Sequence, residues 1–221
     1  MIDILDLEFP LTGDDLPLDH AYPLYAALSR RLPWLHGASP PVDAGEAAEP
    51  APGVFPVVGR PTQKRTLALS PRSRLRVRLP AHRLAEAASL AGERLKVAGQ
   101  CVTTGPPTLI PLRPCPTLVA DLVTIKLAHH SKTDPLPFLQ AVDRQLAALG
   151  VEAEAGLRTH SGGERAGQPH RKVLRIRGAI RVGYPVVVMG LTADDSLQLQ
   201  RHGLGGRRRM GCGLFRVEKA G

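Results

Sequence analysis

The chain has 221 residues, a length that allows one large hydrophobic core or two small ones. Its 29 Lys and Arg against 20 Asp and Glu give a formal net charge of +9, which indicates affinity for anions, although an arginine-rich excess also follows from GC-rich coding. The three cysteines form no CxxC pair, which argues against a zinc site and a disulfide framework and fits a reducing cytoplasm.

The amino-terminal half reads as a mixture of strands and helices. Its opening, MIDILDLEFPL, carries acidic residues where a secretory signal has basic ones, and no later apolar run has the length needed to span a bilayer. We therefore expect a cytoplasmic protein. The patterns predict strands at 2–9, 54–59, 74–79 and 95–102, and helices at 20–32 and 80–91.

The carboxyl-terminal half shows clearer boundaries. One helix is expected from a cap at Asp134 to a stop at Gly150, and a second opens with a capping box of Thr192 and Asp195 and ends at Gly203. The predicted strands are 117–128, 171–180, 181–191 and 213–218.

The order of elements is β-α-β-β-α-β in the second half and, more faintly, in the first. This is the ferredoxin-like arrangement, so we expect an α+β fold of two tandem ferredoxin-like domains. The first would span residues 1–104 and the second 117–221, joined by a proline-rich linker at 105–116.

A glycine-rich loop, GLGGRRRMGCG at 203–213, joins the last helix to the last strand. Glycine lets main-chain N–H groups approach a phosphate, and arginine supplies charge and planar donors, so the loop predicts binding to a phosphate backbone, with RNA as the leading ligand. It is not a Walker A loop, because Gly213 precedes Leu214 and not Lys-Ser/Thr. A flexible basic turn is the alternative. The candidate RNA-binding residues of the loop are Gly203, Gly205, Gly206, Arg207, Arg208, Arg209, Gly211 and Gly213.

Two further features carry candidate functional residues. Basic and apolar residues alternate from Arg171 onward. Arg171, Lys172 and Arg175 would extend an RNA-binding surface along a hairpin, although an ordinary solvated strand explains them as well.

His36 follows Pro33, which must end the first helix, and a loop imidazole can reach a ligand. His20 begins the same helix, and for both histidines a surface or hydrogen-bonded imidazole is the alternative.

The chain resembles the Cas6 family of CRISPR-associated endoribonucleases within the RAMP superfamily, and most closely its Myxococcus-type (Cmx6) branch. The resemblance spans the chain and rests on LEFPLTGDDLPLDHAYPLYAALSRRLPWLHG, PTLVADLVTIK, PFLQAVDRQLAALG, LRIRGAIRVGYPVVVMGLTADDSLQLQ and GLGGRRRMGCGLF. It implies cleavage of precursor CRISPR RNA within each repeat, without metal or other cofactor. The ribose 2′-hydroxyl would attack the adjacent phosphate and leave a 2′,3′-cyclic phosphate and a 5′-hydroxyl.

The resemblance also implies catalytic residues and partners. His36 matches a family histidine that acts as general base or acid, and His20 matches a second histidine of some members. Ser29 and Tyr25 lie near a family tyrosine that is not clearly matched, and Lys126 is a candidate for stabilising charge on the phosphorane. Expected partners are CRISPR repeat RNA and other Cas effector subunits.

Two rival functions stay open. Sibling RAMP proteins share this fold and loop yet serve as non-catalytic RNA-binding subunits of CRISPR effector complexes. A basic ribosome-associated or DNA-associated protein would bind nucleic acid without regard to the repeat.

Overall fold

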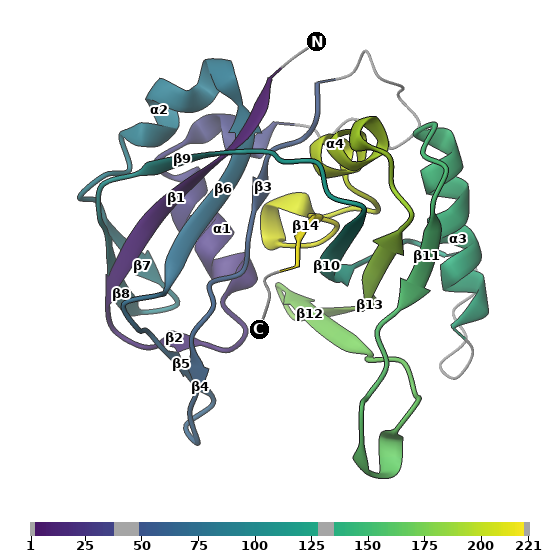
Figure 1. The fold of residues 1–221 in the computed structure, drawn as a ribbon. Helices are drawn as coiled ribbons and strands as arrows, with labels where there is room; N and C mark the ends of the chain where they lie inside the picture. Colours follow the sequence, from purple (N-terminus) through teal and green to yellow (C-terminus); the bar gives the residue numbers. More distant parts are fainter. Residues whose placement is uncertain (1–2, 38–48, 128–134, 219–221) are drawn as a thin grey trace.

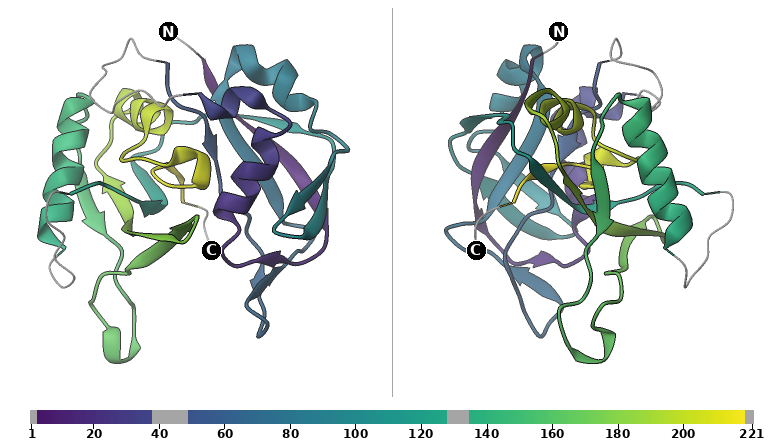
Figure 2. Two further views of the ribbon diagram at one scale, coloured as in Figure 1. Left: turned by 180° about the vertical axis from the view of Figure 1, so that it is seen from behind. Right: turned by 45° about the vertical axis from the view of Figure 1, so that its right-hand side comes forward.

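The computed structural model describes residues 3–37, 49–127 and 135–218. The chain forms two halves that lie side by side, each built on an antiparallel sheet (Figure 1). Helix α1 (Ala21–Ser29) lies behind the amino-terminal sheet in Figure 1 and in front of it in the left view of Figure 2. Among the described residues, none of the helices combines the length and apolar character required to cross a bilayer.

The amino-terminal sheet has the order β3-β6-β1-β8-β7, with β9 also paired to β1. A three-stranded sheet of order β2-β5-β4 lies below it (Figure 1). The strands are β1 (Ile4–Gly13), β2 (Leu16–Pro17), β3 (Gly53–Val54), β4 (Arg60–Pro61), β5 (Thr66–Ala68), β6 (Arg74–Pro80), β7 (Arg94–Val97), β8 (Gln100–Thr104) and β9 (Thr108–Pro111). The other helices are the 3₁₀ helices η1 (Pro33–His36) and η2 (Ala81–Arg83) and the α-helix α2 (Leu84–Ala88).

The carboxyl-terminal sheet has the order β11-β13-β10-β14, and β12 pairs with β13. Its strands are β10 (Thr117–Val123), β11 (Glu154–Leu157), β12 (Lys172–Ile176), β13 (Ala179–Met189) and β14 (Arg216–Val217). Its helices are α3 (Leu136–Ala148), α4 (Ala193–His202), η3 (Gly163–Arg165) and η4 (Arg208–Met210).

Both halves contain the ferredoxin-like sheet, in which the second, third, first and fourth strands lie in that order. In the first half these strands are β3, β6, β1 and β8, and in the second they are β11, β13, β10 and β14. The predicted fold class is therefore confirmed. Each half packs its own cluster of buried apolar side chains, one around Phe9 and Leu75 and the other around Val186 and Phe215.

Two predicted elements need correction, and one strand was not predicted. The single strand expected at 95–102 is the hairpin β7–β8, because Ala98 and Gly99 adopt φ values of 50° and 92° and turn the chain back. Arg177 and Gly178 make a similar turn, so the apolar strand predicted at 181–191 begins at Ala179 instead. The second strand of the carboxyl-terminal ferredoxin unit is β11, which we did not predict.

Other boundaries agree with the sequence or lie outside the described residues. The Thr192 hydroxyl accepts a hydrogen bond of 3.1 Å from the Asp195 N–H, as a capping box requires, and Gly203 ends α4 with φ 64°. The expected cap at Asp134 lies outside the described residues. The segment expected to be a linker includes β9, which pairs with β1, and the division into domains at 105–116 stays a prediction.

The buried side chain of Arg78 connects the two halves. Arg78 of β6 donates bonds of 2.7 and 2.9 Å to the two carboxylate oxygens of Asp6, and both side chains are 1% exposed or less. The same guanidinium donates to the backbone carbonyls of Gln200 and Phe215 at 2.8 and 2.7 Å. Because these carbonyls belong to α4 and to the segment before β14, Arg78 fixes the second half against the sheet of the first.

Candidate active site and RNA-binding surface

His36 and Tyr25 form the centre of the candidate active site. Three residues separate the end of α1 from Pro33, which begins η1, and this short turn brings Nδ1 of the exposed His36 to 3.2 Å from the Tyr25 hydroxyl. The two rings meet edge to face with centroids 5.8 Å apart. An imidazole that hydrogen bonds to a phenol is oriented and still accessible, as a group that transfers protons to a bound substrate must be.

The carboxyl-terminal half supplies cations to the same place. Helix α1 contacts η4 of the glycine loop, and Arg209 of η4 interacts electrostatically with Tyr25. Partial burial lowers the pKa of Arg209, and its buried Nε finds no acceptor among the described residues. The Nε of Arg177, at the β12–β13 turn, donates a 2.5 Å hydrogen bond to the Tyr22 hydroxyl. The left view of Figure 2 shows α1 beside the loop that carries η4.

His20 does not belong to this site, which corrects its assignment as a catalytic candidate. Its side chain is 5% exposed, Nε2 accepts a 3.0 Å bond from the Val57 N–H, and Nδ1 therefore donates to the Pro17 carbonyl at 2.9 Å. Both ring nitrogens are used, so His20 is a structural residue that ties the start of α1 to the segment after β3.

The burial of His20 predicts a pH dependence of stability. Desolvation lowers its pKa below 6.5 in the folded chain, so the unfolded chain binds a proton first as the pH falls. The free energy of unfolding should therefore be constant above about pH 7 and fall below about pH 6.5, with a slope of up to about 1.4 kcal/mol per pH unit. Urea unfolding of the unaltered protein and of His20→Gln between pH 8 and 5 tests this. If the free energy of unfolding changed with pH equally in both proteins below pH 6.5, the result would contradict the prediction.

Two other catalytic candidates lie apart from the His36–Tyr25 pair. Ser29 is 3% exposed and its hydroxyl donates 2.8 Å to the Tyr25 carbonyl one turn back, so it is not available to a substrate, and we correct that assignment. Lys126 is exposed after β10, and within the described residues no contact joins it to His36. The neighbouring pair His129–His130 lies outside the described residues.

The glycines of the 203–213 loop serve its internal packing, which corrects the expectation that their N–H groups cradle phosphate. The N–H of Gly205 donates to Gln145 Oε1 at 2.7 Å, and that of Gly206 donates to the Thr124 carbonyl at 3.0 Å. At Gly213 a Cβ would collide with the Leu204 carbonyl oxygen. The N–H groups of Gly203, Gly211 and Gly213 likewise donate to backbone carbonyls. Anion binding by this loop therefore falls to its side chains.

The three consecutive arginines have different environments. Arg208 is 6% exposed and donates to the backbone carbonyls of Ala51, Arg201 and His202, so it holds the loop in place and is not free for RNA. Burial and the nearby Arg78 lower the pKa of Arg208 to about 9, which leaves it charged at neutral pH. Arg207 and Arg209 are partly exposed. Only these two of the three offer their charge to a ligand.

The basic hairpin and the glycine-rich loop both contact α1. Arg171, Lys172 and Arg175 are exposed on and just before β12, and α1 contacts β12. The carboxyl-terminal half therefore brings two basic segments, the hairpin and the loop with Arg209, into contact with the helix that carries Tyr25.

The family model with the description Cas6 Crispr matches residues 5–220. The chain belongs to the Cas6 family. The CRISPR-associated endonuclease Cas6 of Myxococcus xanthus (strain DK1622) is 39% identical to it over 211 residues, which cover 96% of this chain and 80% of that protein. The predicted family and the predicted enzyme class are confirmed.

Solved structures support the Cas6 fold. A CRISPR associated protein Cas6 covers 98% of this chain with all of its own, at a TM-score of 0.67 and 13% identity. A RAMP protein that binds different RNA substrates covers 97% of this chain with all of its own, at a TM-score of 0.66 and 10% identity. At these identities the likeness concerns the fold, and it agrees with the two ferredoxin-like units.

The sequence-based assignment of this Cas6 site missed two residues. Tyr25 was left without a role, although a helical spacing of three and four residues puts it on one face with Tyr22 and Ser29. Arg177 was assigned only to a basic strand, and its position at the turn follows from the Gly178 beside it.

Proposed function

We propose that this Cas6 protein is a metal-independent endoribonuclease that cleaves precursor CRISPR RNA within its repeats to give mature guide RNA. The observation that carries this proposal is the hydrogen bond between His36 and Tyr25, which lies next to the cation Arg209. A proton-transfer group, an orienting phenol and a guanidinium are the groups that transesterification of a phosphodiester needs.

The proposed chemistry begins at the ribose 2′-hydroxyl. With the Nδ1–H of His36 donating to the Tyr25 oxygen, the Nε2 lone pair accepts the 2′-hydroxyl proton. The 2′-oxygen attacks the adjacent phosphorus, the bond from phosphorus to the 5′-oxygen breaks, and that oxygen takes up a proton from water, while His36 returns its proton to solvent. The products carry a 2′,3′-cyclic phosphate and a 5′-hydroxyl. Arg209 would stabilise the negative charge of the phosphorane, because its guanidinium is partly exposed beside Tyr25 and partial desolvation strengthens its electrostatic interactions.

RNA binding is proposed for the exposed cations of the carboxyl-terminal half. Arg171, Lys172 and Arg175 of the hairpin and Arg207 of the loop would contact phosphates of the repeat stem, since A-form helices are recognised mainly by shape and backbone. Other Cas effector subunits would be further partners.

The products formed in EDTA test this proposal. End-labelled repeat RNA and a scrambled RNA of equal length are incubated with the protein, and the termini are identified by mass spectrometry. The proposal predicts cleavage of the repeat alone, with a cyclic phosphate and a 5′-hydroxyl. Termini bearing a 3′-hydroxyl and a 5′-phosphate would refute it, and tight binding without cleavage would favour the non-catalytic subunit.

The different environments of the loop arginines predict different effects of substitution. The double variant Arg207→Ala/Arg209→Ala should bind repeat RNA more weakly and reduce the slope of log affinity against log salt by about 1.5 to 2, because two phosphate contacts are lost. Arg208→Ala should lower the thermal unfolding midpoint instead, because three backbone carbonyls lose their donor. Salt titrations and thermal melts of both variants test this; an unchanged slope in the double variant would contradict the binding role.

A further inference from the structure

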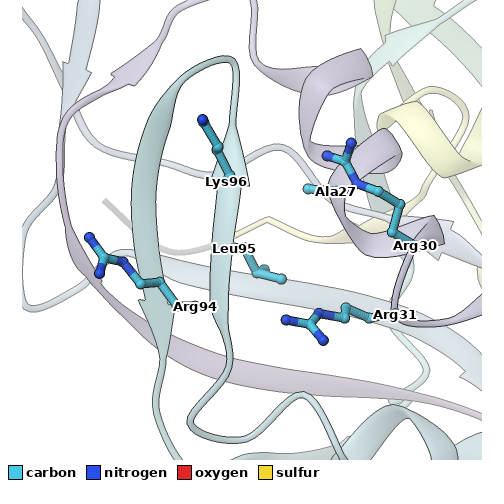
Figure 3. A pocket seen from close by; sticks show the side chains of 6 residues that line it. All are labelled: Ala27, Arg30, Arg31, Arg94, Leu95 and Lys96. Atoms are coloured by element: carbon cyan, nitrogen blue, oxygen red, sulfur yellow. The ribbon is translucent and has the colours of Figure 1, made fainter.

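A basic pocket lies on the amino-terminal half, away from the loop and the hairpin. It has a volume of about 320 Å³ and opens between the end of α1 and β7. Figure 3 shows Arg30 and Arg31, which directly follow α1, and Arg94 and Lys96 of β7 around it. The residues that line it are Ala27, Arg30, Arg31, Arg94, Leu95 and Lys96.

The periodicities of the two elements produce this arrangement. On β7 the buried Leu95 and Val97 alternate with Arg94 and Lys96, which both point outward. On the helix side the buried Ala27 forms part of the floor, and Arg30 and Arg31 follow it by three and four residues and so stand above the same face. The pocket therefore has an apolar floor and a cationic rim.

The positive charge of this rim is mostly uncompensated. Arg31 pairs with Glu93 at 2.8 Å, which braces one side of the pocket. Within the described residues, no carboxylate oxygen lies within ion-pair distance of Arg30, Arg94 or Lys96, and all three are exposed. Three free cations around one concavity repel each other unless an anion is bound, so the pocket suits a phosphate group.

The pocket is separate from the proposed catalytic pair. Arg30 follows Tyr25 by five residues, which at 3.6 residues per turn is a rotation of roughly 140° around α1. The pocket and the His36–Tyr25 pair therefore lie on different faces of α1, and an RNA strand would have to pass around the end of α1 to contact both. A volume of about 320 Å³ admits single nucleotides and excludes a duplex.

We propose that this pocket binds backbone phosphate of a single-stranded RNA segment that flanks the cleaved bond. The proposal rests on the proposed function, since it requires that repeat RNA is the substrate. The guanidinium groups of Arg30 and Arg31 and the apolar floor would also accept the face of a base, so the contact tolerates any sequence.

The test compares binding of two RNAs by the double variant Arg94→Ala/Lys96→Ala. The first RNA is the full-length repeat with a 2′-deoxy nucleotide at the cleavage site, and the second is trimmed to the stem and that nucleotide. For the full-length RNA we expect the affinity to fall about 5- to 30-fold at 0.1 M salt and the salt slope to fall by about 1.4, roughly 0.7 for each lost contact to a single strand. For the trimmed RNA we expect no change.

A matched control is Arg144→Ala, which removes an exposed cation from α3, on the far side of the molecule from α1 (Figure 1). It should bind both RNAs as the unaltered protein does. Equal affinity of the double variant and the unaltered protein for full-length RNA would overturn the proposal, and so would an equal loss with the trimmed RNA. Because binding is measured without turnover, a failure of the proposed cleavage appears separately, as uncleaved native RNA.

Discussion

His36→Ala is expected to slow single-turnover cleavage of repeat RNA by about 10²- to 10⁴-fold while the affinity changes by less than about twofold. The exposed imidazole is the proposed proton-transfer group and is oriented by the Tyr25 hydroxyl at 3.2 Å, but it forms no ion pair that would anchor RNA. Quench-flow or manual time courses at saturating protein measure the rate, and filter binding of 2′-deoxy RNA measures the affinity.

His82→Ala is the control for His36→Ala. His82 is also exposed and lies on η2 next to Glu49, at 3.4 Å, away from the Tyr25 hydroxyl. Its replacement should leave both rate and affinity unchanged. A cleavage rate of His36→Ala equal to that of His82→Ala would remove His36 from the mechanism.

Arg78→Ala is expected to destabilise the protein by about 2–4 kcal/mol, because the buried Asp6 loses its bidentate partner and keeps only its ion pair with Arg76. The loss is compounded at Gln200 and Phe215, whose carbonyls lose the donor that joins the two halves. Urea unfolding followed by circular dichroism measures the effect, and Arg78→Lys, which keeps a charge, covers the case in which the alanine variant does not fold.

Arg216→Ala provides the comparison for the buried pair. Arg216 also bridges both oxygens of a carboxylate, that of Asp121 at 3.0 and 3.1 Å, but the two side chains are 25% and 43% exposed. Solvent screens such a pair, and its loss should cost about 1 kcal/mol or less. If Arg78→Ala and Arg216→Ala were equally stable, the buried pair would not hold the halves together.

Local signals predicted the parts of the structure that depend on local chemistry. Thr192 and Asp195 cap α4 because both groups lie within one turn, and Pro33 ends α1 because it lacks an N–H. Because Pro33 ends the helix, His36 lies exposed just beyond it, and the sequence was sufficient to select His36 as a candidate.

Contacts between distant residues decided the parts that the sequence did not predict. His20 was assigned to the site by its position on α1, but its Nε2 is occupied by Val57, 37 residues away. Arg208 has the same neighbours in the sequence as Arg207 and Arg209, yet its guanidinium bonds to Ala51, 157 residues away. A run of identical residues gives no indication of which one is buried, because burial depends on the packing of the other half.

Single-turnover cleavage of two substrates in EDTA tests the central claim most directly. One is the native repeat RNA, and the other differs only by a 2′-deoxy nucleotide immediately upstream of the scissile phosphate. The proposed mechanism predicts that the first is cut and the second is bound with similar affinity but not cut, because the nucleophile is missing. Cleavage of the 2′-deoxy substrate, or no cleavage of the native RNA until a divalent metal is added, would contradict it.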